Sequence, residues 1–316
     1  MQVIEANDKC IEAMVVLAKR TYEQECMRLE ELTQDDYTDV LRDYITEAIK
    51  NYSGAVCLDK GKLLGYLVYN RMEQINGEDV YTFPVWGYAA VGDKKDQILS
   101  RLFEFMADRM VKSAPARFEV QLYAHDTNAI WLFSCLQFGV EKAECIRNTM
   151  DPVNESCTHS VMELMPEQIT EHWDEIWGGL LSGIGTHFTK SPIFHSGYEF
   201  GEEHYQQLLK APGTRLFAAF DDNQQIIGVL TAEKDPKQFF ISEGDYKAGN
   251  LYVADAYRGQ AVAQDLLQSM NDTMLLEGTW KLIVEHFTSN PQARGFWDRY
   301  FKPYLYTMTR TVRRPQ

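Results

Sequence analysis

The chain has 316 residues, a length that suits two domains of about 150 residues better than one. Its 31 Lys and Arg stand against 46 Asp and Glu, and this net charge of −15 argues against nucleic acid or anionic membrane surfaces as partners. The acidic excess favours a cationic small molecule instead. A hydrophobic content of 45% with 24% charged residues excludes global disorder.

Three features of the sequence bear on the cellular compartment of the protein. The first ten residues, MQVIEANDKC, contain no apolar core of a secretory signal. The longest mostly apolar stretch, residues 80–91, is too short to cross a bilayer. The six cysteines show neither a C-x-x-C pair nor metal-ligand spacing, so we expect free thiols, no metal and a cytoplasmic location.

In chain order, the residue patterns predict the same series of elements twice. Each series has a short strand, helices, a hairpin, a strand, a striped helix, a strand, a helix and a last strand. The hairpins span residues 55–68 and 216–230, with turn formers between their apolar runs. The pattern breaks near residues 150–160, which predicts domains at 1–150 and 160–316.

The two series align without gaps when residue numbers differ by 164, so that Gly87 is aligned with Leu251. At this offset the apolar stripe of one predicted helix falls on the stripe of the other, as the inward face of an amphipathic helix requires. The aligned pairs are Ile98 with Val262, Leu102 with Leu266, Phe103 with Leu267, Met106 with Met270 and Met110 with Met274. We therefore interpret the chain as two copies of one fold.

A short loop in the second copy has the composition of an anion site. The strand ending at Val253 leads through Arg258-Gly259-Gln260-Ala261-Val262-Ala263 into the striped helix. Amide groups at a helix start have no partner within the helix and point at an approaching anion. Small residues let a phosphate reach the backbone, so the sequence predicts a phosphate-binding site.

This passage resembles the acyl-CoA-binding motif of the GNAT family, the Gcn5-related N-acetyltransferases. The family pattern is Arg/Gln-x-x-Gly-x-Gly/Ala, and the chain matches it at Arg258 and Ala263 but has Ala261 where the family has its middle glycine. The resemblance implies an α/β (α+β) fold of two tandem GNAT-like domains, each a mixed, mostly antiparallel sheet flanked by helices. It assigns Leu251, Val253 and the whole loop to coenzyme binding, with the Val253 N–H polarising the thioester carbonyl.

A second resemblance lies downstream at Asn290-x-x-Ala293-x-x-Phe296-Trp297, which is similar to the family signature Asn-x-x-Ala-x-x-Phe-Tyr. It adds Asn290, Ala293 and Trp297 to the coenzyme site. The family tyrosine commonly protonates the departing thiolate, and Trp297 cannot do so. Tyr300, one turn further along the same helix face, is the candidate acid.

Other site residues follow from position in the second copy. Glu285 and His286 end the strand that in this family splays from residues 251–253, and only one of them can face the cleft because a strand alternates faces. We take Glu285 as the candidate base. Residues 181–198 fall where the family lines its acceptor pocket; the alternative is an irregular connector. The candidates there are His187, Phe188, Phe194, His195 and Tyr198.

The first copy lacks the loop signature. Its corresponding segment, residues 93–99, has no Arg-x-x-Gly, and the bulky Gln97 and Leu99 occupy the small-residue positions. Lys94 and Lys95 are the features there that attract phosphate. We expect this copy to be degenerate and to serve as a scaffold.

The predicted function is transfer of an acetyl group from acetyl-CoA, as co-substrate, to a small-molecule amine by direct attack in a ternary complex. The expected assembly is a monomer or a homodimer. Two alternatives stay open: a non-catalytic acyl-CoA-binding or sensing protein, and an aminoacyl transferase of the FemABX type, which pairs two GNAT-like folds without using acyl-CoA.

Overall fold

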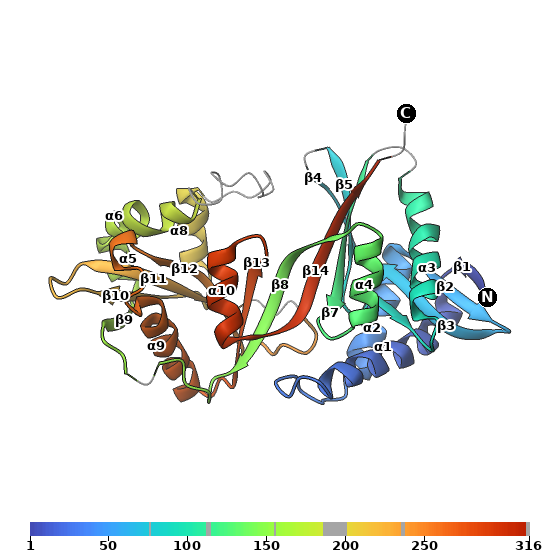
Figure 1. The fold of residues 1–316 in the computed structure, drawn as a ribbon, viewed down its shortest axis with the longest axis horizontal. Helices are drawn as coiled ribbons and strands as arrows, with labels where there is room; N and C mark the ends of the chain where they lie inside the picture. Colours follow the sequence, from blue (N-terminus) through green and yellow to red (C-terminus); the bar gives the residue numbers. More distant parts are fainter. Residues whose placement is uncertain (76, 112–114, 155, 186–200, 235–237, 314–316) are drawn as a thin grey trace. The chain divides into compact units, whose positions relative to one another are not determined.

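The computed structural model describes residues 1–75, 77–111, 115–154, 156–185, 201–234 and 238–313 (Figure 1). The chain divides into two compact units. The second unit comprises Cys145–Lys302, and the first comprises Met1–Glu144 together with the C-terminal segment that begins at Pro303. Strand β8 (Gly139–Asn148) runs across the boundary between them.

The first unit contains two sets of paired strands. Antiparallel strands in the order β1-β2-β3-β6 form one set, and β4-β5-β7-β14 form the other, in which β5 and β7 are parallel. Its elements are β1 (Gln2–Glu5), η1 (Asp8–Cys10), α1 (Ile11–Cys26), α2 (Thr38–Asn51), β2 (Ser53–Asp59), β3 (Lys62–Tyr69), β4 (Arg71–Ile75), β5 (Glu78–Phe83), β6 (Tyr88–Ala90), α3 (Lys95–Met110), β7 (Ala116–Tyr123), α4 (Thr127–Cys135) and β14 (Lys302–Val312).

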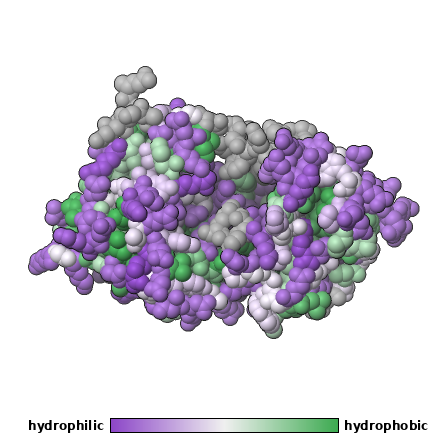
Figure 2. Space-filling model, turned by 180° about the vertical axis from the view of Figure 1, so that it is seen from behind, coloured by the Kyte–Doolittle hydropathy of each residue, from purple (hydrophilic) through white to green (hydrophobic). Residues whose placement is uncertain are grey.

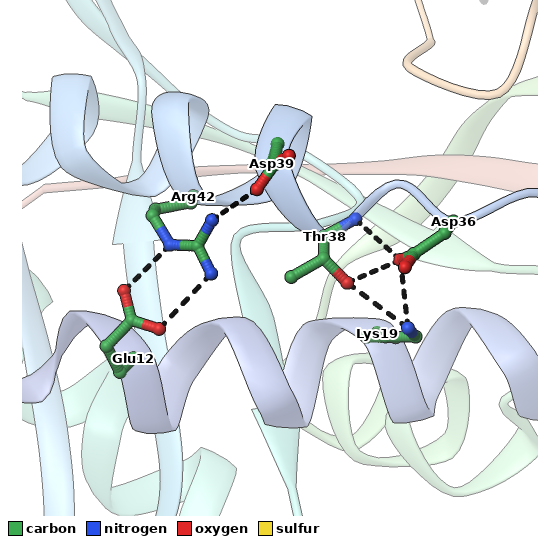
Figure 3. A network of polar contacts seen from close by, with 6 residues as sticks. All are labelled: Glu12, Lys19, Asp36, Thr38, Asp39 and Arg42. Carbon is green, nitrogen blue, oxygen red and sulfur yellow. Dashed lines mark hydrogen bonds and ion pairs between the residues drawn. The ribbon is translucent and has the colours of Figure 1, made fainter.

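Helices α1 and α2 of the first unit are joined by ion pairs on their exposed sides (Figure 3). Arg42 on α2 bonds Glu12 on α1 at 2.8 Å, and Lys19 on α1 bonds Asp36, which precedes α2, at 2.9 Å. Hydrogen bonds from Thr38 and Lys19 lower the pKa of the Asp36 carboxyl group to about 2. Because these ion pairs are exposed, they contribute little to the stability of the unit.

The second unit is a mixed sheet in the order β13-β12-β11-β10-β9. Neighbouring strands are antiparallel except β12 and β13, which are parallel. Its elements are β9 (Ser160–Leu164), α5 (Pro166–Glu171), α6 (Trp173–Ile176), η2 (Trp177–Leu181), α8 (Glu202–Lys210), β10 (Arg215–Phe220), β11 (Ile226–Glu233), β12 (Tyr246–Val253), η3 (Asp255–Tyr257), α9 (Val262–Leu276), β13 (Lys281–Phe287) and α10 (Pro291–Tyr300).

Helices cover both faces of this sheet. Figure 1 shows α6 and α8 on one side of β10–β12 and α9 on the other. On the first side, buried Ile176, Leu180 and Tyr205 pack against Leu216 and Val229. On the second, Gly228 lets α9 approach closely, because a Cβ there would lie 3.0 Å from Val262. Each unit therefore has the predicted fold class, a mixed and mostly antiparallel sheet flanked by helices.

The predicted repeat is confirmed in the element bounds. Strand β3 (Lys62–Tyr69) and strand β11 (Ile226–Glu233) are related by the offset of 164 at both ends. Helices α4 and α10 and strands β8 and β14 keep the same relation to within one residue. The interruption of β5–β6 by residues 84–87 also corresponds to an irregularity within β12.

The last strand of the second copy, β14, belongs to the first compact unit, although it lies at the end of the chain. It pairs antiparallel with β7 of the first unit, from Leu305 opposite Tyr123 to Val312 opposite Ala116, and so buries Leu305 and Met308. The sequence cannot reveal this, because the last strands of the two copies align with each other and have similar apolar patterns. The compact units therefore differ from a division of the chain near residues 150–160, and the domain boundaries 1–150 and 160–316 stay a prediction.

All six cysteines are free thiols, as predicted, while the cytoplasmic location inferred from them stays a prediction. Among the described residues, no helix has the length and apolar character needed to span a membrane. On the face seen in Figure 2, hydrophilic residues predominate and the hydrophobic ones are scattered. This agrees with the acidic, charged composition.

Candidate functional site

The parallel strands β12 and β13 of the second unit are paired along only part of their length. Their register runs from Tyr246 opposite Leu282 to Ala248 opposite Val284 and ends there. The remaining β12 residues, 249–253, are all half-buried, although β12 lies inside the sheet order. We call these residues the unpaired edge.

The unpaired edge presents backbone donors on the side of β13. The N–H of Ala254 donates to the carbonyl of Ile227 at 2.9 Å, while Val253 lies opposite Gly228. Because an antiparallel ladder alternates, the N–H groups of Val253 and Leu251 point away from β11, towards β13. They are available to an extended ligand, as a further strand would use them.

The loop after the unpaired edge is built for close approach to the backbone. Gly259 has φ +79° and Ala261, the residue before α9, has φ +65°. Ala261 has no side-chain acceptor and leaves the first amide groups of α9 uncapped. The position of the family glycine therefore requires a positive φ, and alanine there costs about 1 kcal/mol.

Arg258 folds back over the end of the unpaired edge. Its Nε donates to the Val253 carbonyl at 3.2 Å, its guanidinium pairs with Asp255 at 2.7 Å, and it lies 5.2 Å from the centre of the Tyr252 ring. The side chain is nevertheless 43% exposed. Only residues 259–261 separate Arg258 from the first residue of α9. Gln260 is exposed and bonds the Ala256 carbonyl at 2.9 Å.

The start of α9 is anchored by a buried carboxylate. Asp265 accepts from the Asn154 amide at 2.6 Å, from the backbone N–H groups of Thr158 and His159 at 3.1 and 3.0 Å, and contacts the His159 ring at 2.8 Å. Burial alone would raise the pKa of Asp265, but these bonds outweigh it and lower the pKa below its usual range. The anchor fixes the first turn of the helix.

A polar cluster lies where the unpaired edge begins. Two β12 residues oppose Thr231 there in a bulge, and the Thr231 hydroxyl accepts from the Asn250 N–H at 2.7 Å and donates to Glu233 at 2.8 Å. Glu233 also pairs with Lys247 at 3.3 Å, and Tyr205 donates to the Asn250 side chain at 3.3 Å.

A β-carbon at Gly249 would lie 2.0 Å from the Glu233 carboxylate, so a larger residue there would displace that carboxylate from the cluster. Burial and the charge of Glu233 raise the pKa of Tyr205. Sequence reasoning missed this cluster, although Gly249, directly before the predicted strand that ends at Val253, was a signal for a bulge.

Strand β13 directs Glu285 and His286 to opposite faces. Ala248 lies opposite Val284, on the face of the sheet away from Glu233, so Glu285 lies on the same face as Glu233. His286 is only 5% exposed and faces α10. Glu285, and not His286, is therefore on the face of the polar cluster.

Helix α10 borders the β13 side of the site. Asn290 caps it by accepting from the N–H groups of Gln292 and Ala293, both at 3.1 Å. Trp297 is buried and packs edge-on against Phe301. Tyr300 lies 5.2 Å from the Phe296 ring and within electrostatic range of Arg147, whose pKa burial lowers.

The five predicted acceptor-pocket residues, His187, Phe188, Phe194, His195 and Tyr198, lie outside the described residues. The helical segment just before them contributes Gly183, where a β-carbon would lie 2.4 Å from the Tyr252 ring. That close approach holds Tyr252 against the α6 side of the sheet.

The first unit fills the position that corresponds to the unpaired edge. Tyr88 aligns with Tyr252 and is fully buried; its hydroxyl accepts from the Tyr123 N–H on β7 at 3.2 Å and donates to Asp126 at 3.1 Å. Lys95 forms an ion pair with Asp126. The side chain of Tyr88 thus bridges β6 and β7.

A polar cavity of about 230 Å³ lies beside this bridge, lined by residues of α1 such as Arg20 and by Gly92 and His125. Sites for drug-sized ligands typically measure ~300–1,000 Å³. The cavity is therefore small for a coenzyme A molecule.

Residues 183–301 match the model of the Acetyltransferase (GNAT) family. This part of the chain is therefore a GNAT-family acetyltransferase domain, and it contains the unpaired edge, the loop and α10. Acyl-CoA-dependent acyl transfer is the chemistry that this fold supports in general.

Solved structures show the same fold over the whole chain. A GCN5-related N-acetyltransferase from Sphaerobacter thermophilus is 13% identical, with a TM-score of 0.56 over 99% of this chain and 97% of that one. A tandem GNAT protein from the clavulanic acid biosynthesis pathway is 11% identical, with a TM-score of 0.51 over 100% of both chains. No curated protein sequence matches the chain. The structural likeness bears out the tandem arrangement.

Proposed function

We propose that the chain transfers an acetyl group from acetyl-CoA to the amine of a small molecule, in the second unit. The observation that carries this proposal is the end of strand pairing at Ala248 and Val284, which leaves a row of β12 amides unpaired in front of an uncapped helix. An extended pantetheine arm fits the first feature and a pyrophosphate fits the second.

The residues that we assign to coenzyme binding fall into groups, each for a different part of acetyl-CoA. Leu251 and Val253 offer backbone N–H groups to the arm and thioester, and residues 258–263 offer amides and the Arg258 charge to the pyrophosphate. Asn290, Ala293 and Trp297 shape the α10 side of the site. The residues present fit acetyl-CoA, since small side chains and positive φ angles leave the backbone open.

The acceptor amine attacks the thioester carbonyl carbon, the C–S bond breaks, and the amine proton passes to a base. Glu285 is our candidate base, and Glu233 on the same face is a second one that accepts a proton directly or through water. The acidic net charge of −15 also favours a cationic acceptor. Tyr300 remains our candidate acid for the departing thiolate. The residues lining the acceptor pocket, at 187–198, belong to the same proposal.

The first unit is, in this proposal, a degenerate domain that acts as a scaffold. The bridge from Tyr88 to Tyr123 and Asp126 supports this role, because it occupies the corresponding edge.

The test is release of free thiol from acetyl-CoA over a panel of small amines, with calorimetric binding of acetyl-CoA measured in parallel. We expect turnover with at least one amine, and a 10²–10⁴-fold lower kcat in Glu285→Gln or Glu233→Gln. The exposed Glu243→Gln is the matched control. Binding without turnover would favour a sensing protein, and no binding would favour a FemABX-type transferase.

A further inference from the structure

A cysteine, a histidine and an aspartate converge in the second unit outside the acyl-transfer site. Cys145 is the first residue of that unit, His286 lies on β13 and Asp298 on α10. The Cys145 Sγ is 3.8 Å from His286 Nε2, and Nε2 is 3.2 Å from Asp298 Oδ1. All three candidate ligand atoms lie within 4.8 Å of one another.

These separations are close to those around a tetrahedral metal ion. Bonds of about 2.3 Å to sulfur and about 2.0 Å to nitrogen or oxygen place S and N about 3.5 Å apart, and N and O about 3.3 Å apart. The observed 3.8 and 3.2 Å therefore require only small shifts. In the described residues this is the group of three that meets the geometric condition.

The three side chains meet at one ring nitrogen. The sulfur and the carboxylate both approach the same atom, His286 Nε2, which in a neutral ring either donates or accepts but not both. An ion bound by all three groups would satisfy Nε2, the sulfur and the carboxylate together.

We propose that Cys145, His286 and Asp298 bind one Zn²⁺ ion. A thiolate, an imidazole and a carboxylate form a donor set of borderline softness that suits Zn²⁺ and disfavours Mg²⁺ and Ca²⁺. On binding, the thiol proton is released to solvent. Asp298 is half-exposed, so water reaches the fourth position.

The ion would link β8, β13 and α10. His286 lies on the face of β13 away from Glu285, so the ion does not contact the acetyl group but holds the helix that carries Trp297 and the Asn290 cap. Its role is to position α10. Sequence analysis did not detect this site, because ligands at 145, 286 and 298 follow no metal-binding motif.

The test uses the full chain, treated with a chelator and then titrated with Co²⁺ and with Zn²⁺. We expect one Co²⁺ per chain, with a thiolate-to-Co²⁺ charge-transfer band and the intense visible bands of tetrahedral Co²⁺, all displaced by Zn²⁺. Zn²⁺ should also raise the thermal midpoint of unfolding, and the chelator should reverse the rise.

Variants assign the ligands independently of acetyl transfer. Cys145→Ser should abolish the charge-transfer band and lower Co²⁺ affinity at least 100-fold, whereas Cys157→Ser, at an exposed thiol of the same unit, should change neither. Asp298→Asn, at a half-exposed site that tolerates substitution, should keep the band and weaken binding about tenfold. Absence of the band in the wild type, or its persistence in Cys145→Ser, would overturn the proposal.

Discussion

The two copies of the fold differ most at one strand edge. In the second unit, the pairing of β12 with β13 ends at Ala248, before residues 249–253, and Tyr252 packs beside Gly183. In the first unit the aligned Tyr88 turns inward and bonds Tyr123 and Asp126. One framework thus accommodates either an open backbone edge or a closed one, and a few side chains decide which it is.

The largest expected effect comes from giving the second copy the loop residues of the first. Ala261→Gln with Ala263→Leu introduces the side chains of Gln97 and Leu99 at the aligned positions. Bulky groups at a positive-φ residue and in the first turn of α9 block the backbone amides, so calorimetry should show at least a 100-fold loss of acetyl-CoA affinity. Leu276→Gln, at an exposed residue near the other end of α9, is the control; equal binding by the double variant would contradict the assignment.

The next largest effect is expected at Asp265, the buried carboxylate that anchors the start of α9. The first copy has Arg101 at the aligned position. Asp265→Asn should lower the free energy of unfolding by about 2–3 kcal/mol at neutral pH, since it weakens several bonds to a buried charge. Because the folded-state pKa of Asp265 is lowered, its stabilisation is present above the unfolded-state value near 4 and is lost as pH falls through the folded value.

The pH dependence is measured by denaturant unfolding. Wild type should lose stability more steeply than Asp265→Asn as pH falls below about 4. Parallel curves for the two proteins would show that the carboxylate is not held in its charged form.

Gly183→Ala tests what keeps Tyr252 out of the unpaired edge. The added methyl would lie 2.4 Å from the ring, so Tyr252 must move, and acetyl-CoA affinity should fall about tenfold, or ~1.4 kcal/mol. The matched control is Gly179→Ala, which meets no atom within 4 Å. If both variants bind equally well, the position of Tyr252 does not govern access.

The smallest effect is expected at Ala261, where the family pattern has a glycine. Ala261→Gly should raise the free energy of unfolding by about 0.5 kcal/mol, because glycine adopts φ +65° without strain but loses more chain entropy. Ala263→Gly, inside α9, should instead lower it by up to about 1 kcal/mol. Thermal unfolding of the two variants distinguishes these signs, and a fall in both would show that Ala261 is unstrained.

The sequence predicted those parts of the molecule that depend on local pattern. The repeat, the striped helix and the Arg258–Ala263 loop follow from apolar periodicity and from small residues at a helix start. Asn290 was recognisable as part of a motif, and in the structure its side chain caps the start of α10.

What the sequence did not reveal depends on long-range pairing. Glu233, Asn250 and Tyr205 come together through the bulge in β12 and the packing of α8, which carries Tyr205. The pairing of β14 with β7 was also hidden, since β8 carries an equivalent pattern. The acceptor segment at 187–198 lies outside the described residues, so its predicted role remains a prediction.

The most direct measurement of the central claim is a crystal structure of the full chain with acetyl-CoA. The account predicts one coenzyme per chain, with its pantetheine arm along Leu251 and Val253 and its pyrophosphate on the amides that follow Ala261. A coenzyme bound beside Tyr88 instead, or strands β12 and β13 paired to their ends with no coenzyme between them, would contradict it.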